Sequence, residues 1–139
     1  MMVLVDTPIW SLSLRRKPTD LSQREEVLVH ALRDLIQQGR AQIAGPIRQE
    51  LLSGIRELER FRKLRNMLHA FSDPLLEMAD YEEAAEMSNR CRTQGISGSP
   101  IDFLICAVAQ RRRWQVFTSD QDFQSYRKAV PVNLYAASE

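Results

Sequence analysis

The first residues of the chain hold the feature that most constrains its fold. The apolar run from Val3 to Val5 ends at Asp6, and Thr7-Pro8 follow at once. Consecutive apolar residues are typical of a short strand buried on both faces. Thr is favoured as a helix cap and Pro in the first helical turn. The sequence therefore predicts a buried strand that passes directly into a helix.

Helices are predicted in four further places. Apolar residues recur at helical spacing from Arg24 to Gln38 and from Asp80 to Gln94, and a glycine follows each segment, as is usual at helix C-termini. A third helix is expected to begin at Gly45-Pro46 and to continue through Leu64 after a bend near Gly54. A fourth begins at Ser99-Pro100-Ile101-Asp102, which has the form of a capping box.

The remaining apolar segments predict short strands. They are Ala41 to Ala44, Gln115 to Thr118 and Val130 to Tyr135. Strands that alternate with helices indicate an α/β fold, here a small, mainly parallel sheet of four to five strands flanked by helices. A chain of 139 residues with 44% hydrophobic residues and 27% charged residues is typical of one globular domain, spanning 1–139.

The composition of the chain indicates where the protein is located, but it does not identify a partner. A formal net charge of +1 neither favours nor excludes nucleic acid, because the distribution of charge matters more than the sum. Cys91 and Cys106 lie in predicted helices without metal-binding spacing, and we expect buried, reduced thiols. No apolar run approaches the roughly 20 residues that a membrane helix needs. We therefore expect a cytoplasmic protein without a membrane partner.

Four acidic residues are placed where a ligand site is expected. Asp6 and Asp120 follow predicted strand ends, and open parallel sheets bind ligands outside the carboxyl ends of their strands. Asp102 falls in the first turn of its helix, and Glu50 lies one turn into the helix that Pro46 opens. Taken singly, Asp102, Asp120 and its neighbour Asp122 are explained equally well as capping or turn residues. Their combination indicates a site.

Such a cluster needs a cation. Two carboxylates ~4 Å apart repel by about 4 kcal/mol at an effective dielectric constant of ~20. Mg²⁺ or Mn²⁺ binds sets of carboxylate oxygens that contain no His or Cys. A divalent ion of this kind activates water and stabilises the leaving oxygen in phosphodiester hydrolysis. The sequence therefore predicts a metal-dependent hydrolase.

With these residues in place, the chain resembles the PIN-domain ribonucleases, specifically the VapC-type toxins of type II toxin–antitoxin pairs. The resemblance spans nearly the full length and rests on the order and spacing of four segments. They are Val3 to Thr7, Ile47 to Gly54, Gly95 to Asp102, and Val116 to Phe123.

The resemblance implies an Mg²⁺- or Mn²⁺-dependent endoribonuclease with Asp6, Glu50, Asp102 and Asp120 as catalytic residues. Among them, Asp6, Asp102 and Asp120 would hold the metal, with Asp122 and Thr118 as possible additional site residues. It also implies an RNA substrate, a cognate antitoxin that covers the site, and a homodimer. Among several basic clusters, Arg15 and Arg16 are the best candidates for RNA binding, because they follow soon after Asp6.

Two other functions stay open at this point. A catalytically silent relative that only binds RNA or a protein would share the fold. A phosphoryl-accepting receiver domain also combines aspartates, Mg²⁺ and a parallel sheet. A receiver needs adjacent acids after its first strand, whereas Asp6 is followed by Thr7-Pro8.

Overall fold

A small parallel sheet forms the centre of the protein. The computed structural model describes residues 1–138 and contains the strands β1 (Val3–Val5), β2 (Ala41–Gln42) and β3 (Gln115–Phe117). The strand order is β2-β1-β3, and both neighbours run parallel to β1. All three residues of β1 are fully buried, as the unbroken apolar run predicted. The prediction of an α/β fold with a parallel sheet is confirmed.

The predicted strand from Val130 to Tyr135 is wrong. This segment touches β3 through one isolated parallel bridge between Val116 and Leu134, and the sheet of residues 1–138 has three strands rather than four to five. Two hydrogen bonds form the bridge, from the amide of Val116 to the carbonyl of Asn133 and from the amide of Tyr135 back to Val116.

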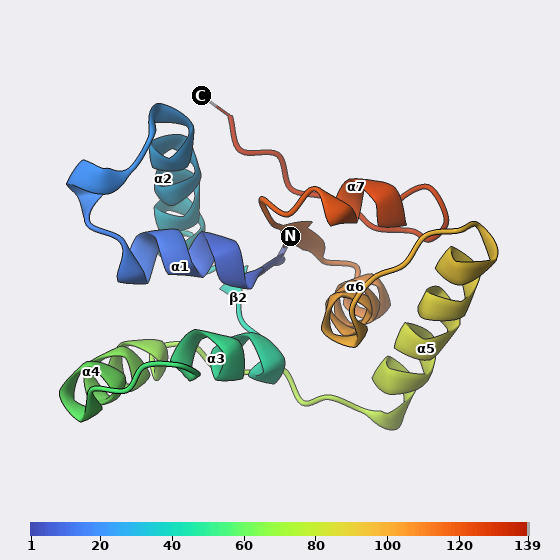
Figure 1. Ribbon diagram of the computed structural model, residues 1–139, viewed down its shortest axis with the longest axis horizontal. Coiled ribbons are helices and arrows are strands. Elements are labelled where there is room, and N and C mark those ends of the chain that lie inside the picture. The colour runs from blue at the N-terminus through green and yellow to red at the C-terminus, as the bar shows by residue number, and fades with distance from the viewer. Residues whose placement is uncertain (139) are drawn as a thin grey trace.

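Helices surround the sheet (Figure 1). The N-terminal half contains α1 (Thr7–Arg15), a 3₁₀ turn (Pro18–Asp20), α2 (Gln23–Gln37), α3 (Gly45–Leu52) and α4 (Leu58–Leu68). The C-terminal half contains α5 (Met78–Thr93), α6 (Pro100–Arg112) and the short α7 (Asp122–Tyr126). α1 packs against α2 and α3, while α5 and α6 lie side by side and α6 contacts β1 and β3. Within residues 1–138, every helix falls short of the length and apolar character that crossing a bilayer requires.

The helix predicted from Gly45 through Leu64 is two helices. α3 ends at Leu52, and α4 begins at Leu58. Gly54 between them has a φ of 86°, a left-handed conformation that glycine adopts at little cost and that ends the helix instead of bending it. Arg48 on α3 donates to the carbonyl of Leu68 and to the carboxylate of Asp73, so the broken segment folds back on itself.

Hydrogen bonding attaches α1 to the sheet. The indole of Trp10 is fully buried and donates to the carbonyl of Val5 at 2.9 Å. The helix cap is Asp6 rather than Thr7, because the Asp6 carboxylate accepts the amide of Thr7 at 2.8 Å. An aspartate at this position satisfies a free helix amide and brings the carboxylate to the carboxyl end of β1.

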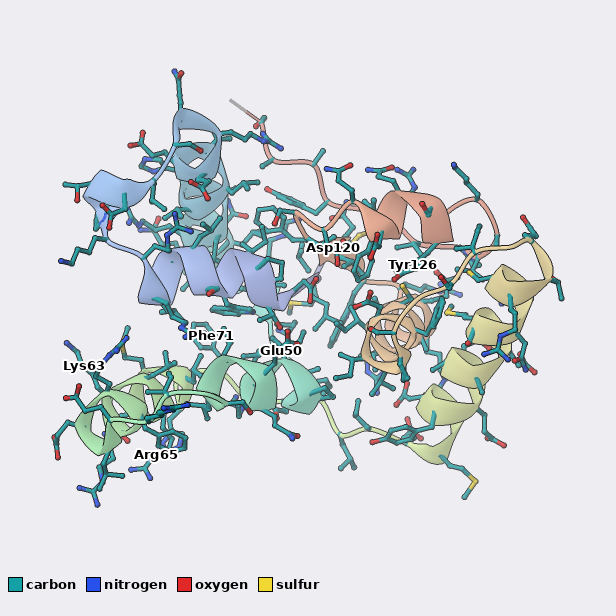
Figure 2. All side chains as sticks on the ribbon, in the orientation of Figure 1. Glu50, Lys63, Arg65, Phe71, Asp120 and Tyr126 are labelled. Carbon is teal, nitrogen blue, oxygen red and sulfur yellow. The ribbon has the colours of Figure 1, made fainter. Side chains whose placement is uncertain are left out.

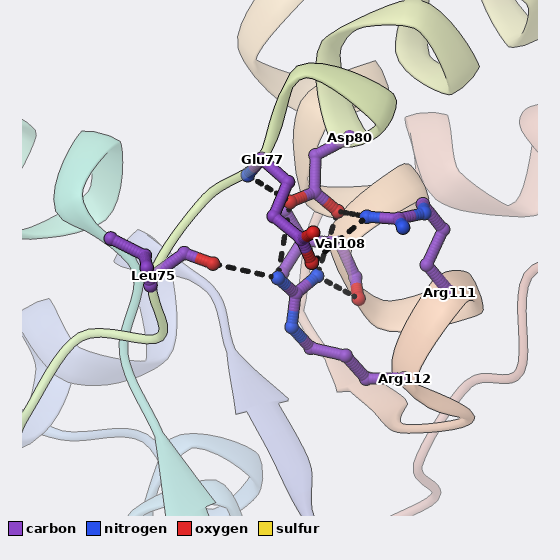
Figure 3. Close-up of polar contacts among 6 residues, drawn as sticks. All are labelled: Leu75, Glu77, Asp80, Val108, Arg111 and Arg112. Carbon is purple, nitrogen blue, oxygen red and sulfur yellow. Dashed lines mark hydrogen bonds and ion pairs between the residues drawn. The ribbon is translucent and has the colours of Figure 1, made fainter.

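A buried ion cluster joins α5 to the end of α6 (Figure 3). The carboxylate of Asp80 has no exposed surface, and it accepts from Arg111 at 2.8 Å and from Arg112 at 2.8 and 3.0 Å. Arg112 also donates to the carbonyls of Leu75 and Val108. The hydrogen bond from Arg112 is the main cause that lowers the pKa of Asp80 far below its usual range. Arg111 and Arg112, in the basic run at the end of α6, therefore stabilise the fold through Asp80.

Candidate functional site

The carboxylate of Asp6 lies between the end of β1 and the start of α1. Only 5% of the residue is exposed. Its two oxygens accept hydrogen bonds from the Thr7 amide at 2.8 Å and from the Thr118 hydroxyl at 2.8 Å. A carboxylate has about four acceptor positions, so two remain for another donor or a cation. These bonds hold Asp6 in one orientation.

Thr118 connects Asp6 to the next acid. Its hydroxyl donates to Asp6 and accepts the backbone amide of Asp120 at 3.0 Å. The carboxylate of Asp120 in turn accepts the amide of Asp122 at 2.9 Å, which shapes the turn before α7. The segment after β3 therefore positions three predicted site residues through hydrogen bonds with its own backbone.

Three acids approach closely enough to share one cation. Asp102, Asp120 and Asp122 each offer a carboxylate oxygen, and these oxygens lie within 4.8 Å of one another. Within residues 1–138 this is the one group of acidic, His or Cys ligands that meets this spacing. Two members, Asp102 and Asp120, are among the predicted ligands. The third is Asp122 rather than Asp6.

Glu50 lies on α3, at the edge of the cluster. Its carboxylate is exposed and accepts the hydroxyl of Thr7 at 3.2 Å. Figure 2 shows Glu50 and Asp120 on different elements, with the N-terminal end of α1 between them. A cavity of about 470 Å³ beside Glu50 is also lined by Ser99, Asp102 and residues of α3. The four predicted acids therefore surround one region at the carboxyl end of the sheet.

Burial and mutual repulsion change the acidity of the site. Burial, the largest cause, raises the pKa of Asp6 from its usual 3.8 to about 6 against the opposing bonds from Thr118 and Thr7. The charges of Asp102 and Glu50 raise it further. Burial also raises the pKa of Asp102, to which the charges of Asp120 and Asp122 contribute. Burying these mutually repelling carboxylates together costs free energy of folding, which a bound cation would offset.

Tyr126 is a site residue that the sequence reasoning missed. Its hydroxyl donates to Asp102 Oδ2 at 2.6 Å (Figure 2 labels Tyr126 on α7). The residue is fully buried, and its ring packs against Phe103 and Phe123. This bond also explains why only half of the predicted capping box forms. Ser99 accepts the amide of Asp102 at 3.1 Å, while the Asp102 carboxylate pairs with Tyr126.

The position of Tyr126 depends on a glycine. A Cβ atom at Gly98 would lie 2.6 Å from the ring and the hydroxyl oxygen of Tyr126. Such an approach forces one of the two residues to move, so Gly98 keeps the space in which the tyrosine reaches Asp102. An aromatic residue four positions after Asp122 is an ordinary core residue by its sequence pattern, and no local signal distinguishes it.

The two predicted RNA-binding arginines lie in different surroundings. Arg16 lines a large groove beside Thr118, together with Arg24 and Arg127. Arg15 lines a separate small hollow formed with Leu14, Ile55 and residues of α4. Arg16 is therefore a neighbour of the acidic site through the groove, whereas Arg15 belongs to the α4 surface.

The buried thiols do not add a nucleophile to the site. Cys91 and Cys106 are both buried and unpaired, in agreement with the expectation of reduced cysteines. Burial is the main cause that raises the pKa of Cys106 far above its usual range, and the charge of Asp102 adds to it. A protonated thiol is a poor nucleophile and a poor metal ligand.

Comparison with known proteins identifies a family. The family model for the PIN domain matches residues 3–129, which covers every element from β1 to α7. No curated protein sequence matches the chain significantly.

Several solved structures share the fold. FitAcB from Neisseria gonorrhoeae is 21% identical, with a TM-score of 0.74 over 98% of each chain. VapBC2 from Rickettsia felis, bound to a DNA fragment from its promoter, is 15% identical, with a TM-score of 0.73 over 97% of this chain and 98% of the other. A toxin–antitoxin complex from Klebsiella pneumoniae is 20% identical, with a TM-score of 0.62 over 87% of this chain and 89% of the other.

Proposed function

Because this chain belongs to the PIN domain family, we propose that it is an Mg²⁺- or Mn²⁺-dependent endoribonuclease that acts as the toxin of a type II toxin–antitoxin pair in the cytoplasm. The observation that carries the proposal is the approach of three carboxylate oxygens, from Asp102, Asp120 and Asp122, to within 4.8 Å. The buried carboxylate of Asp6 lies beside them, linked through Thr118.

The donor set fits a hard divalent cation. All the candidate ligands are carboxylate oxygens, which Mg²⁺ and Mn²⁺ prefer over softer metals. Asp102, Asp120 and Asp122 would hold the ion, and Asp6 would contribute its remaining acceptor positions. When bound, the ion supplies activation of water and neutralisation of charge on the phosphodiester.

The protein side chains have separate tasks in this scheme. Thr118 orients the Asp6 carboxylate, and Tyr126 orients that of Asp102 by occupying one of its oxygens. Glu50 is exposed at the edge of the cluster, where it can take up a proton from water. Ionised Asp6 and Asp102 repel each other, so the cluster favours binding of a cation over retention of two uncompensated charges.

The experiment is cleavage of RNA by the purified protein. The wild type should cut RNA at internal positions in Mg²⁺ or Mn²⁺ and should lose this activity in EDTA. Asp6→Asn, Asp102→Asn and Asp120→Asn should each abolish cleavage while their circular dichroism spectra stay unchanged. Asp34→Asn, on the exposed face of α2, is the matched control that should cut normally. Retained cleavage by the three site variants would reject the mechanism.

A catalytically silent relative would give a different result. Its RNA affinity would be unaffected by chelation of the metal, and the wild type would leave every RNA intact. The acidic cluster favours the nuclease over this alternative, because phosphate binding alone would be weakened by several carboxylates. Membership of the PIN domain family leaves no support for a receiver domain.

The toxin assignment also requires a protein partner. Apolar side chains are exposed on α4, where Leu58 is 57% and Met67 is 46% exposed. Met67 also lines a hollow formed with Leu14, Ile55, Leu64 and the basic Arg15, Arg60 and Lys63. Such a surface suits an amphipathic antitoxin segment with acidic residues. The similar structures include a toxin–antitoxin complex, which supports this choice of partner.

We also propose that the protein forms a homodimer, and a second apolar surface supports this. Tyr81 on α5 and Ile101 on α6 are both exposed beside a cavity of about 630 Å³ between these helices. Sedimentation of the purified protein should give a dimer, and Tyr81→Lys should shift it to a monomer.

The toxin assignment is tested in cells. Growth arrest on expression of this protein should be relieved by the product of a small neighbouring gene. Arrest that no neighbouring gene relieves would count against the toxin–antitoxin assignment.

A further inference from the structure

A groove of about 730 Å³ lies beside the acidic cluster. Its walls come from α1, the start of α2, the segment between β3 and α7, and the chain after Leu134. These elements lie together in the upper part of Figure 1. The volume is within the roughly 300–1,000 Å³ of sites that hold small organic ligands. The groove therefore has room for a nucleotide.

Three arginines line this groove, and they come from separate parts of the chain. Arg16 follows α1, Arg24 lies in the first turn of α2, and Arg127 follows α7. Within residues 1–138, Arg24 and Arg127 form no salt bridge. The fold thus assembles a positive site from residues more than 100 positions apart.

Among the described residues that line the groove, Glu25 is the one acid, and it neutralises little of this charge. Glu25 meets Arg16 at a distance of 3.9 Å, and both side chains are partly exposed. Exposed pairs of this kind contribute little, and their partners exchange readily. One oxygen of Glu25 is committed to the capping box of α2, where it accepts the amide of Ser22. The described residues of the groove therefore carry an excess of positive charge.

The groove is continuous with the acidic site. Thr118 lines it, and the same residue donates its hydroxyl to Asp6. The cavity on the other side of the cluster, beside Glu50 and Asp102, is lined by no lysine or arginine. The surroundings of the acids are thus asymmetric. Of the residues that line the two cavities, the cationic ones all lie in the groove on the α2 and α7 side.

We propose that this groove binds the backbone phosphates of the single-stranded RNA on one side of the cleaved bond. The proposal rests on the nuclease function above and adds the residues that hold the substrate. The acids repel RNA phosphates, so the strand next to the cut needs cations close to them. Arg16, Arg24 and Arg127 supply these cations. The RNA on the other side of the cut lies beside the cavity that Glu50 and Asp102 line without any lysine or arginine, and it is held more weakly.

An acidic peptide is the competing occupant of a basic groove. The adjoining carboxylates of Asp6 and Asp120 disfavour it, because a peptide carboxylate gains nothing from a site that already has an excess of acids. RNA differs, because its scissile phosphate can be neutralised by the metal that the same acids bind. The observations therefore favour RNA over a protein segment.

The test measures RNA affinity and cleavage in charge-reversal variants. Arg24→Glu and Arg127→Glu should each weaken binding of a short fluorescent single-stranded RNA, measured with Ca²⁺ in place of Mg²⁺, by about tenfold, which corresponds to one charge-assisted hydrogen bond. The slope of log affinity against log salt should fall by about 0.7 for each phosphate that the variant no longer binds. In cleavage assays KM should rise by a similar factor while kcat stays close to the wild-type value.

Arg65→Glu is the matched control, because it makes the same change of net charge on α4, far from Asp120 in Figure 2. It should leave affinity and KM within about twofold of wild type. If the wild type cuts RNA but the groove variants behave like this control, the groove assignment fails alone. If the wild type cuts no RNA, the proposed function fails. If an acidic peptide binds wild type but not Arg24→Glu, while RNA binds both equally, the groove serves a protein partner and the inference is overturned.

Discussion

Replacement of Asp6 by Asn should make the metal-free protein more stable at the expense of its activity. The carboxylate is 5% exposed, and its burial, with the charges of Asp102 and Glu50, raises its pKa from 3.8 to about 6. Asn has nearly the same shape and no charge. Its oxygen can accept the Thr7 amide, and its NH₂ group can donate to the Thr118 hydroxyl, which rotates to accept.

The size and sign of the effect follow from the two pKa values. A folded-state pKa above the unfolded value means that ionisation destabilises the fold, and the penalty grows as pH rises from about 4 to about 6. At 1.36 kcal/mol for each pH unit, the full penalty is about 3 kcal/mol at pH 8. At pH 4 the carboxyl group is largely protonated in the folded state and about half protonated in the unfolded state, so the penalty falls below about 1 kcal/mol.

The assay is urea unfolding, followed by tryptophan fluorescence in EDTA at pH 4, 6 and 8. Asp6→Asn should exceed the wild type in free energy of unfolding by about 3 kcal/mol at pH 8, and the difference should nearly vanish at pH 4. Asp34→Asn should show neither effect. A variant that is less stable than the wild type at pH 8, or a difference that does not change with pH, would refute the assignment of Asp6 as a destabilising buried acid.

Four further measurements test the remaining features of the site and the fold. Saturating Mn²⁺, at about 100 times its dissociation constant, should stabilise the wild type by about 2.7 kcal/mol, and thermal unfolding should show no such gain for Asp102→Asn. Tyr126→Phe removes the hydroxyl that orients Asp102, so calorimetry should give Mn²⁺ affinity about tenfold weaker with the fold intact. Gly98→Ala places a methyl group 2.6 Å from Tyr126 and should reduce Mn²⁺ affinity in the same direction, whereas Gly45→Ala, whose new Cβ meets no atom closer than 3.4 Å, should not. Asp80→Asn leaves two arginines without their buried partner and should cost about 3 kcal/mol at pH 7 by urea unfolding. The folded-state pKa of Asp80 is depressed, so its contribution to the free energy of unfolding is present above pH ~4 and is lost as pH falls below that value. If the stability of the wild type parallels that of the variant over this pH range, the role of the cluster is contradicted.

Local patterns in the sequence were sufficient for most of the fold. The apolar run before Asp6 predicts a buried strand because only a strand covered on both faces needs every residue apolar. Periodic apolar residues located α2 and α5 to within two residues at each end. Prediction was poorest where a few non-local contacts decide the outcome. The segment after Val130 has strand-like residues, yet it pairs with β3 at one position.

The sequence by itself determined that acids follow the ends of parallel strands, since strand ends can be recognised locally and the topology brings them to one edge. It did not determine which oxygens approach one another. The packing of α7 beside α6 decided that Asp122 joins Asp102 and Asp120, that Tyr126 reaches Asp102, and that Asp6 is held by Thr118 instead. Packing likewise paired Arg112 with the buried Asp80, while it left Arg24 and Arg127 to line the groove. These outcomes depend on contacts between residues distant in the chain, and no local pattern records the distance between two side chains.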